Sequence, residues 1–202
     1  MPQRAFCDAT DGRRGLLLAN RGLPEVAVVE GATSELALTL LRCVGWLSRA
    51  DFSTRRGHAG PATATPGAQE IGRHRFDYAL IPHGGHGLEA YADAYAFDVP
   101  LRTVDRPRHG GTLPPAASFL RAEPAAFILS AVKPAENGPG LVVRGYNVTG
   151  DPLCVTLAPR GPFARAARVR LDEEELEALP LAADGSVTLE ARGHEIVTVK
   201  FE

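Results

Sequence analysis

Five of the six histidines precede residue 110, and two of them, His83 and His86, lie three apart in "PHGGHG". Neighbouring histidines are common zinc ligands, and a catalytic zinc needs three protein ligands and one open position. His58, His74 and His109 complete no recognised spacing, and no cysteine or carboxylate accompanies the pair at one. Glycine-rich flanks do not hold ligands rigidly, so we interpret the pair as loop histidines that are exposed or hydrogen-bonded. A metal-dependent enzyme built on His83 and His86 is the alternative.

Other reactive side chains give no stronger pattern. The candidate serine nucleophiles are Ser48, Ser53, Ser118 and Ser130. None of them lies in the G-x-S-x-G turn of hydrolases. The acidic residues gather at 172–177, which favours a solvated face over a buried pair of carboxylates. The cysteines form no C-x-x-C pair and are interpreted as small buried side chains; they are Cys7, Cys43 and Cys154. The sequon at Asn147 is interpreted as a turn before Gly150.

The loop "DFSTRRGHAGPATATPGAQ", residues 51–69, is the best remaining candidate for a binding site. A guanidinium presents a planar fork of donors suited to carboxylates, phosphates or vicinal hydroxyls. Gly57 and Gly60 permit backbone conformations and close approaches that other residues resist. We expect Arg55 to pack on a sheet edge or be solvated, and the residues alone leave the role of Arg56 open.

Composition restricts the class of partner. The 202 residues carry a net charge of -2, and a nucleic-acid footprint needs a clustered basic surplus, so no nucleic acid is expected. The basic residues are almost all arginine, with lysine only at Lys133 and Lys200. We expect no membrane span, since no apolar run reaches about 18 residues, and the first residues lack a signal pattern. The sequence therefore predicts a soluble, cytoplasmic protein.

Glycine and proline interrupt the first half and indicate short strands joined by turns. The continuously apolar run from Leu40 predicts a strand buried on both faces, with Trp46 in the core. Residues 73–83 alternate with a period of two, which predicts a strand that Pro82 closes. Residues 88–97 are expected to form a short helix or turn, because leucine and alanine are good helix formers.

A linker is expected at 106–118, where proline, glycine and charges gather without periodicity. Apolar runs then recur about every 10 residues, which is typical of a small antiparallel sandwich. Within it, residues 171–179 are expected to form an acidic, solvent-facing connection, attached to the sandwich by Leu171, Leu176 and Leu179.

Four stretches together resemble the C-terminal β region of bacterial glycoside hydrolase family 38, the α-mannosidase family. They are "DGRRGLLLANRGLPE", the run from "LTLLRCVGWLSRADFSTRRGHAGP" to "DYALIPHGG", "FILSAVKPAENGPGLVVRGYNVTG" and "HEIVTVKFE". The resemblance covers nearly the whole chain. It implies an all-β fold, with residues 1–112 as the end of a large galactose-mutarotase-like β-supersandwich. Residues 113–202 would then form a small immunoglobulin-like β-sandwich.

The resemblance also implies a function. Family members are retaining glycosidases whose catalytic aspartate and divalent metal, usually zinc, belong to an N-terminal domain, so no cofactor or metal site is expected here. The expected partners are that catalytic domain and a mannose-containing glycan, and the chain alone is expected to be inactive. In the family a loop presents an arginine in an Arg-Gly step to the active site, which makes Arg56 and Gly57 the candidate substrate-binding residues. This chain departs from its relatives after His83, where "GGHGLE" replaces an Asp-Trp pair.

Two other possibilities complete the expectations. An isolated part of a supersandwich exposes an apolar face or strand edge, so a homo-oligomer is possible. The alternative function is a stand-alone β-sandwich module that binds carbohydrate or protein without hydrolysis. Such modules present an exposed aromatic platform, and the expected burial of Trp46, the single tryptophan, counts against this alternative.

Overall fold

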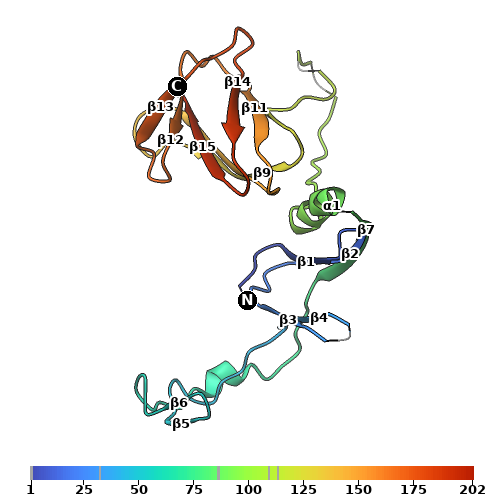
Figure 1. The fold of residues 1–202 in the computed structure, drawn as a ribbon, viewed down its shortest axis with the longest axis vertical. Coiled ribbons are helices and arrows are strands. Elements are labelled where there is room, and N and C mark those ends of the chain that lie inside the picture. Colours follow the sequence, from blue (N-terminus) through green and yellow to red (C-terminus); the bar gives the residue numbers. More distant parts are fainter. Residues whose placement is uncertain (1, 32, 86, 109, 113) are drawn as a thin grey trace. The chain divides into compact units, whose positions relative to one another are not determined.

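The computed structural model describes residues 2–31, 33–85, 87–108, 110–112 and 114–202. The chain divides into two compact units, an N-terminal unit of Met1–Asp105 and a C-terminal unit of Arg106–Glu202 (Figure 1). This division lies at the start of the expected linker, and a domain boundary after residue 112 stays a prediction. In the part that the structure describes, no helix is long and apolar enough to cross a membrane.

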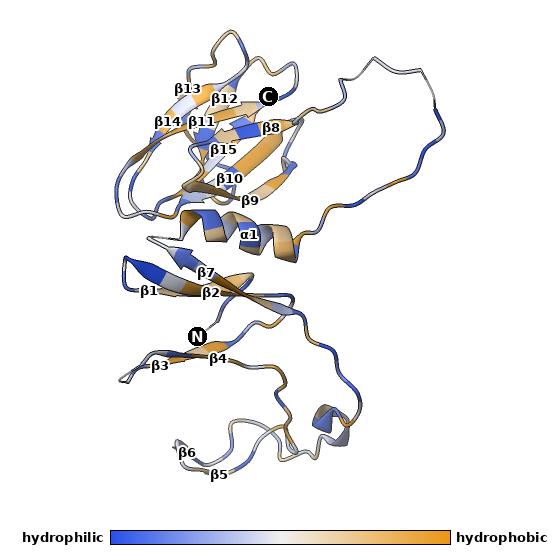
Figure 2. Ribbon diagram, turned by 90° about the vertical axis from the view of Figure 1, so that its right-hand side faces the viewer, coloured by the Kyte–Doolittle hydropathy of each residue, from blue (hydrophilic) through white to orange (hydrophobic). Residues whose placement is uncertain are grey.

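The N-terminal unit is built on a three-stranded antiparallel sheet in the order β1-β2-β7. The strands are β1 (Phe6–Thr10), β2 (Arg14–Asn20) and β7 (Tyr78–Gly84). The helix α1 (Leu88–Asp98) lies along one face, where Ala90 and Ala94 pack on Leu17 and Ala19 (Figure 2). The expectation of a helix at 88–97 is confirmed, because four small and apolar side chains on facing surfaces bring helix and sheet together.

Two short hairpins complete this unit. The strands β3 (Val26–Val29) and β4 (Glu35–Leu38) pair on the side of the sheet away from α1 (Figures 1 and 2). The strands β5 (Asp51–Phe52) and β6 (Arg55–Arg56) pair farther along, before the 3-10 turn Pro66–Gln69. An open hollow of about 760 Å³ separates the β4 side from the sheet and is lined by Leu16, Leu18, Leu36 and Leu80, among others.

The strand expected from Leu40 is absent, since β4 ends at Leu38 where its partner β3 begins. Large apolar side chains in this stretch are instead exposed, namely Leu40, Leu41, Val44, Trp46 and Leu47. The expected core position of Trp46 is also wrong, because its side chain is 47% exposed. A continuously apolar run is buried only where strands on both sides and layers on both faces surround it.

The strand expected at 73–83 is displaced. It starts only at Tyr78, opposite Asn20, since β2 offers no partner beyond that residue. It also continues through Pro82 to Gly84, with Pro82 opposite Leu16. Among the described strands β7 is at the edge of its sheet, and on an edge strand a proline is tolerated because alternate N–H groups face away from the partner.

The C-terminal unit is a sandwich of two antiparallel sheets, in the orders β13-β12-β15-β10-β9 and β14-β11-β8. The strands are β8 (Leu120–Glu123), β9 (Phe127–Pro134), β10 (Leu141–Asn147), β11 (Leu153–Pro159), β12 (Ala166–Val169), β13 (Glu175–Leu179), β14 (Val187–Ala191) and β15 (Ile196–Phe201). Inward-facing side chains of both sheets form one buried cluster that includes Val155, Leu157, Val199 and Phe201. The expected antiparallel sandwich is therefore present.

The acidic segment at 171–179 differs from the expectation. Residues Glu175–Leu179 form the edge strand β13 rather than a connection, because Glu177 lies opposite Arg168 and Leu179 opposite Ala166 on β12. The segment is solvent-facing as expected, and charged side chains are a usual feature of edge strands. Leu171 and Leu176 do not attach it to the core, since they are 64% and 58% exposed.

Candidate functional site

The candidate loop is carried on an arm of the N-terminal unit formed by residues 44–65. Its two sides are held by backbone hydrogen bonds from Leu47 N to Thr63 O (2.8 Å) and from Thr65 N to Gly45 O (3.0 Å). A β-bridge joins Trp46 to Ala64, between those two bonds. This narrow ladder leads the chain out to β5 and β6 and back again (Figure 1).

Nearer the tip, the Ser48 hydroxyl orders the returning strand. Ser48 is buried, and its Oγ accepts a hydrogen bond from the Ala59 backbone N–H at 3.1 Å. The segment between these two residues is therefore closed at its base. We call residues 51–57 the arginine hairpin.

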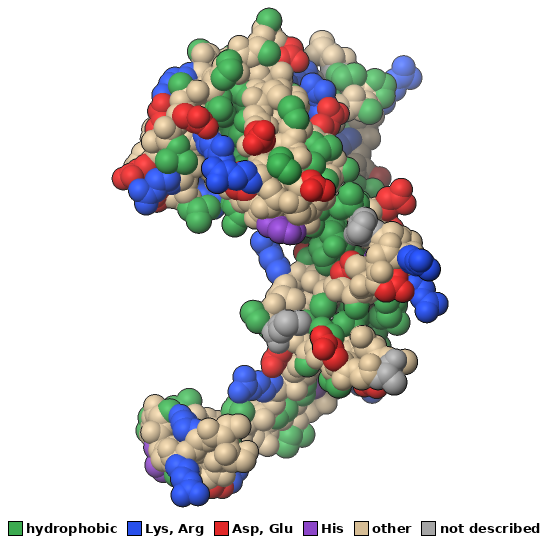
Figure 3. All heavy atoms as spheres, viewed as in Figure 1, with side chains coloured by type: hydrophobic (Ala, Val, Ile, Leu, Met, Phe, Trp, Pro, Cys, Tyr) green, Lys and Arg blue, Asp and Glu red, His purple; other side chains and the backbone are tan. Residues whose placement is uncertain are grey.

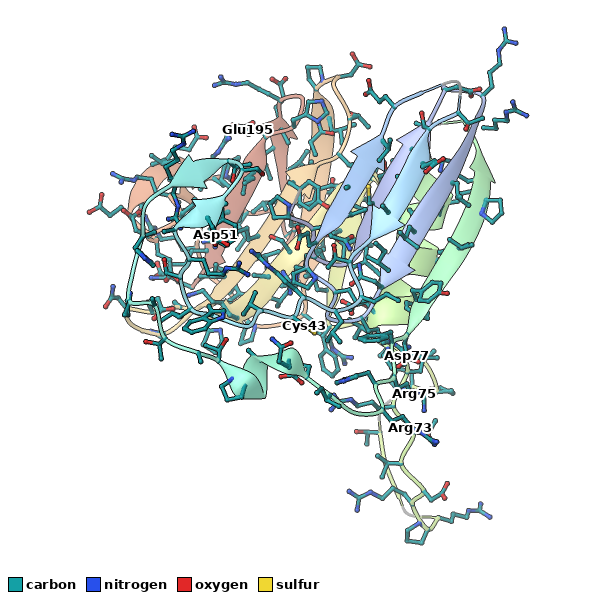
Figure 4. The ribbon with its side chains drawn as sticks, turned by 90° about the horizontal axis from the view of Figure 1, so that it is seen from below. Cys43, Asp51, Arg73, Arg75, Asp77 and Glu195 are labelled. Atoms are coloured by element: carbon teal, nitrogen blue, oxygen red, sulfur yellow. The ribbon has the colours of Figure 1, made fainter. Side chains whose placement is uncertain are left out.

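Asp51 in this hairpin is committed to a neighbour. Arg49 Nε donates to Asp51 Oδ1 at 2.8 Å, and a second guanidinium nitrogen forms an ion pair with the same carboxylate. The hydrogen bond from Arg49 lowers the pKa of Asp51. Asp51 lies opposite Arg56 in the strand register, but its carboxylate is already neutralised by Arg49; Figure 4 labels Asp51 on the hairpin.

The two arginines of β6 differ in their contacts. Arg55 lies over the Phe52 ring, with 5.7 Å from the guanidinium carbon to the ring centroid, and donates a long bond to the Arg49 carbonyl at 3.4 Å. Arg56 is exposed and has no hydrogen bond or ion pair with any residue that the structure describes. The expectation for Arg55 is therefore met by packing on Phe52, and Arg56 is the arginine with an uncommitted guanidinium.

Gly57 follows in a left-handed conformation, with φ of +83°. A Cβ at this position would meet no atom within 4 Å, so the backbone conformation, not lack of space, favours glycine. The chain turns sharply directly after Arg56. A contact of Arg56 or Gly57 with substrate stays a prediction.

The histidines that the structure describes do not assemble into a metal site. His58 is exposed in the arm, and His74 is 2.6 Å from the Glu70 carbonyl, with its ring stacked near Phe76. His86 and His109 lie outside the described residues. Over the described ranges there is no group of three or more His, Cys, Asp or Glu side chains that could hold a metal ion. The residues described here thus do not fit the divalent metal of the family.

His83 has a partner that the sequence did not reveal. Its Nε2 is 2.8 Å from Asp8 Oδ1, and the Tyr91 hydroxyl donates to Asp8 Oδ2 at 3.3 Å. The His83 and Asp8 side chains are only 7% and 9% exposed. The hydrogen bond that His83 donates to Asp8 raises the pKa of His83 despite burial, which opposes the shift. The interpretation of His83 as a hydrogen-bonded histidine is confirmed, although it lies on β7 and not in a loop.

Two glycines make this pair possible. A Cβ on Gly15, which lies opposite His83 on β2, would collide with the His83 ring, so glycine lets the ring reach across β2 to β1. A Cβ on Gly87 would also approach the ring and the Asp8 carboxylate. Because the two charged groups are 75 positions apart, no local spacing could have predicted the pair. It joins β1 to β7, beside an open hollow of about 600 Å³ at the start of α1.

The remaining nucleophiles are not activated by histidine. Ser118 and Ser130 bond to backbone carbonyls, those of Leu120 and Arg144. The expectation of buried cysteines is wrong for Cys43 and Cys154, which are exposed, while Cys7 is half-buried and burial raises the pKa of its thiol. Along the segment that enters β7, Arg75 forms an ion pair with Asp77 (Figure 4).

Asn147 has a structural role that fits the expected turn. It is fully buried, and its Oδ1 accepts from both the N–H and the hydroxyl of Thr149 at 2.8 Å. Its Nδ2 donates to the carbonyls of Asp151, Ala191 and Arg192. Asn147 therefore fixes the turn after β10 and ties it to the end of β14.

Comparison with known proteins shows what the chain is similar to. Residues 126–199 match the sequence model of the glycosyl hydrolases family 38 C-terminal beta sandwich domain. The chain is 32% identical, over 95% of its length, to a Halalkalibacterium halodurans protein named "Putative mannosylglycerate hydrolase". The chain resembles the C-terminal β region of glycosyl hydrolase family 38 proteins.

Two crystal structures extend this likeness to the fold of the family 38 region. One is of a family 38 protein from Enterococcus faecalis, with a TM-score of 0.76 and 30% identity. The other is of an α-mannosidase from Enterococcus faecalis V583, with a TM-score of 0.77 and 31% identity. Each comparison covers 100% of this chain. The expected family resemblance and all-β fold class are confirmed.

The relatives are much longer than the present sequence. The chain spans 20% of the Halalkalibacterium halodurans protein and 22% and 21% of the two Enterococcus faecalis chains. It therefore matches about a fifth of each. What those proteins do as wholes does not transfer to this fifth by similarity alone.

Proposed function

We propose that this chain is the non-catalytic C-terminal β region of an enzyme that hydrolyses α-mannosides. In this role it supports the catalytic domain and extends the arginine hairpin into the sugar pocket. The observation that carries the proposal is Arg56, an exposed guanidinium without a partner among the described residues, at the end of a braced arm. The backbone hydrogen bonds and the β-bridge of the arm fix the place from which the Arg56 side chain projects, which favours a defined position for this arginine.

Exposed apolar side chains support the association with a larger protein. In the N-terminal unit they include Tyr78 and Leu80 of β7, which are 53% and 59% exposed, on the sheet face opposite α1. Trp46, Leu47 and Phe52 of the arm are also exposed. Patches of this kind mark surfaces that bind other protein. We propose that the rest of a family 38 enzyme covers them.

Chemistry within the chain supports a non-catalytic role. His83 and Asp8 are largely buried and bonded to each other, so neither presents a free base or acid. The described residues supply no metal-binding group. The catalytic acids and metal of the reaction would come from the catalytic domain, and the chain alone is expected to be inactive.

Substitution of Arg56 tests the proposal. In a complete family 38 enzyme that carries residues 1–202 as its C-terminal region, Arg56→Ala should lower kcat/KM for an α-mannoside by roughly tenfold or more, as loss of a charged hydrogen bond does. Steady-state kinetics measures this. Because the Arg56 side chain is exposed and forms no hydrogen bond or ion pair with a described residue, the variant should fold normally, and unchanged kinetics would contradict the assignment.

Two finer points are part of the same proposal. We place the boundary between the supersandwich part and the immunoglobulin-like part after residue 112, and we place the enzyme in the cytoplasm. Limited proteolysis within residues 106–118 tests the boundary, and cell fractionation tests the location.

A second candidate function is favoured by the exposure of Trp46. We consider a stand-alone module that binds carbohydrate through Trp46, since exposed aromatic rings are usual sugar platforms. Trp46 is the single tryptophan of the chain, so its fluorescence reports on this site alone. A saturable change on titration of the isolated chain with mannose oligosaccharides would support the module, and no change would favour the first proposal.

A further inference from the structure

The turn between β12 and β13, residues 170–174, lies over the outer face of the five-stranded sheet, and we call it the strap. We propose that the buried Glu173 carboxylate holds the strap across this sheet to β9, and that protonation of the carboxylate releases the strap in acid. Only the C-terminal unit takes part, so the strap is independent of the proposed function.

The outer face of this sheet is buried at its centre. Val143, Val197 and Val199 belong to the core cluster. Because side chains alternate along a strand, Val142 on β10 and Thr198 on β15 face away from that core. Both are nevertheless buried, with exposed fractions of 0% and 3%. Their burial therefore needs a cover on the outer side of the sheet.

The strap covers Thr198 through an arginine. Arg144 on β10 donates from Nε to the Thr198 hydroxyl and from Nη2 to the Leu171 carbonyl, both at 2.9 Å. The guanidinium thus lies between the sheet and the backbone of the strap. Acidic and basic side chains lie close together over the part of the unit where Figure 1 shows β12 and β13 (Figure 3).

The Glu173 carboxylate holds the strap on the far side of the sheet. Its Oε1 accepts a hydrogen bond from Lys133 Nζ at 2.6 Å, and its Oε2 accepts one from the Glu136 backbone N–H at 2.8 Å. Lys133 lies opposite Val142 in the strand register, so the same bond closes the cover over Val142. Since the strands run in the order β13-β12-β15-β10-β9, the strap reaches past β15 and β10 to hold β9.

Glu173 adopts this position at a cost. Its φ is +68°, a left-handed conformation that residues with a side chain rarely adopt, and its side chain is only 4% exposed. A left-handed backbone and a buried charge both cost free energy, and the two hydrogen bonds to the carboxylate offset that cost. Beside the strap, an open hollow of about 440 Å³ gives it room to move, and its lining includes Leu171, Leu176 and Ile196.

The groups around Glu173 favour its ionised form. The hydrogen bond from Lys133 and then that from the Glu136 N–H lower the pKa of Glu173 below its usual 4.5, and attraction to Lys200 adds to the shift, whereas burial opposes it. The stability from these bonds is therefore complete above about pH 4.5 and is lost as pH falls through the lowered pKa. The other charged groups of the surrounding elements have partners of their own, and they are the Glu136 carboxylate, Lys200 with Glu202, Arg144 on β10, and Arg170, Asp172 and Glu174 of the strap.

Amide hydrogen exchange of the full 202-residue chain tests the proposal. It would be followed by NMR from about pH 7 to about pH 3 and corrected for the intrinsic effect of pH on exchange. The N–H groups of Glu136 and Glu173, which bond to the carboxylate and to the Arg170 carbonyl, report on the strap. Their protection should fall roughly tenfold or more below pH 4.5, because charged hydrogen bonds are lost. The paired residues Val143 and Val199 should stay protected.

Two variants identify the titrating group. Glu173→Gln keeps the size of the side chain without the charge, so its strap should already exchange fast at pH 7 and change little in acid. Lys133→Met leaves the buried carboxylate with fewer partners, which raises its pKa, so the strap should open at a higher pH than in the wild type.

Glu174→Gln is the matched control. Glu174 is the next residue of the strap and pairs with Arg170, but its side chain is 71% exposed. Exposed ion pairs contribute little to stability, so this variant should leave the protection of the strap within about twofold of the wild type at each pH.

Several results would overturn the proposal. They are a wild-type strap that stays protected at pH 3, a Glu173→Gln strap that stays protected at pH 7, and an unchanged opening pH in Lys133→Met. An effect of Glu174→Gln as large as that of Glu173→Gln would show a general effect of charge and contradict the role of Glu173. Loss of protection at Val143 and Val199 at the same pH would show that acid unfolds the whole unit, which would also overturn the strap as a separate element.

Discussion

The two units of this chain differ in how completely they bury their apolar side chains, although both are built from short antiparallel strands. The C-terminal unit encloses one continuous cluster between its two sheets, with Phe201, Val199 and Leu157 fully buried. The N-terminal unit buries a much smaller cluster under α1, and most of the exposed large apolar side chains among the described residues belong to it. The C-terminal unit is a complete sandwich, whereas the sheet of the N-terminal unit has one well-covered face, the one under α1.

The C-terminal unit therefore supplies stability through its own core, and the N-terminal unit supplies surface for contact. Apolar burial is the main favourable term in folding, so the C-terminal unit has the means to hold itself together. The N-terminal unit leaves apolar surface and the arginine hairpin for something else to cover. Substitutions at equivalent features of the two units test this contrast, because the stability changes they cause can be compared.

The largest effect is expected in the core of the C-terminal unit. Phe201→Ala should lower its free energy of unfolding by about 3–5 kcal/mol, because a fully buried aromatic ring is replaced by a cavity. Leu80→Ala on the open sheet face of the N-terminal unit is the comparison and should change stability by less than about 1 kcal/mol. Hydrogen exchange of peptides from each unit, followed against urea, measures both. Equal losses would contradict the contrast.

A smaller effect is expected from two fully buried asparagines that hold turns, one in each unit. Asn147→Ala should cost about 3 kcal/mol, since it leaves several carbonyls and the Thr149 N–H without a partner. Asn20→Ala should cost about 1–2 kcal/mol, because among the described residues its side chain has fewer partners, the Ala5 carbonyl and the Leu23 N–H. Denaturant titration ranks the pair, and the reverse order would show that the N-terminal turn is the more constrained.

The smallest effect concerns pH and is confined to the N-terminal unit. Since the folded-state pKa of His83 is raised above its usual 6.5, the stability from the His83–Asp8 pair is complete below about pH 6.5 and is lost as pH rises through the raised pKa. Hydrogen exchange of peptides in β1 and β7 should therefore report lower stability at higher pH. Asp8→Asn should remove that pH dependence, and the C-terminal unit serves as the internal reference.

The sequence predicted the C-terminal unit better than the N-terminal one, for a physical reason. Strands such as β11 and β14 alternate between side chains that face the buried cluster and side chains that do not, so the sequence pattern and the burial agree. The pattern at 40–47 indicated burial, but no strand or layer in the described chain surrounds those residues. The edge strand β13 was missed because its charged side chains suit a connection as well as a wet edge.

Part of the candidate site could likewise be predicted from the sequence, and part could not. The arginine hairpin could be found from its residue types and its family resemblance, because Arg-Arg-Gly is contiguous. Only the structure shows the contacts that occupy Arg49, Arg55 and Asp51 and leave Arg56 without a partner among the described residues. The His83–Asp8 pair could not be found from spacing, since the two residues are distant in sequence and Gly15 on β2 leaves room for the His83 ring to reach Asp8 on β1.

Complementation most directly tests whether the N-terminal unit is needed for hydrolysis by a family 38 catalytic part. The part of the Halalkalibacterium halodurans relative that precedes its match to this chain would be assayed on an α-mannoside by itself, joined to residues 1–202, and joined to residues 106–202. Hydrolysis is expected only when residues 1–202 are joined, because the N-terminal unit supplies the docking face and Arg56. Full activity of the preceding part alone, or with residues 106–202 only, would contradict it.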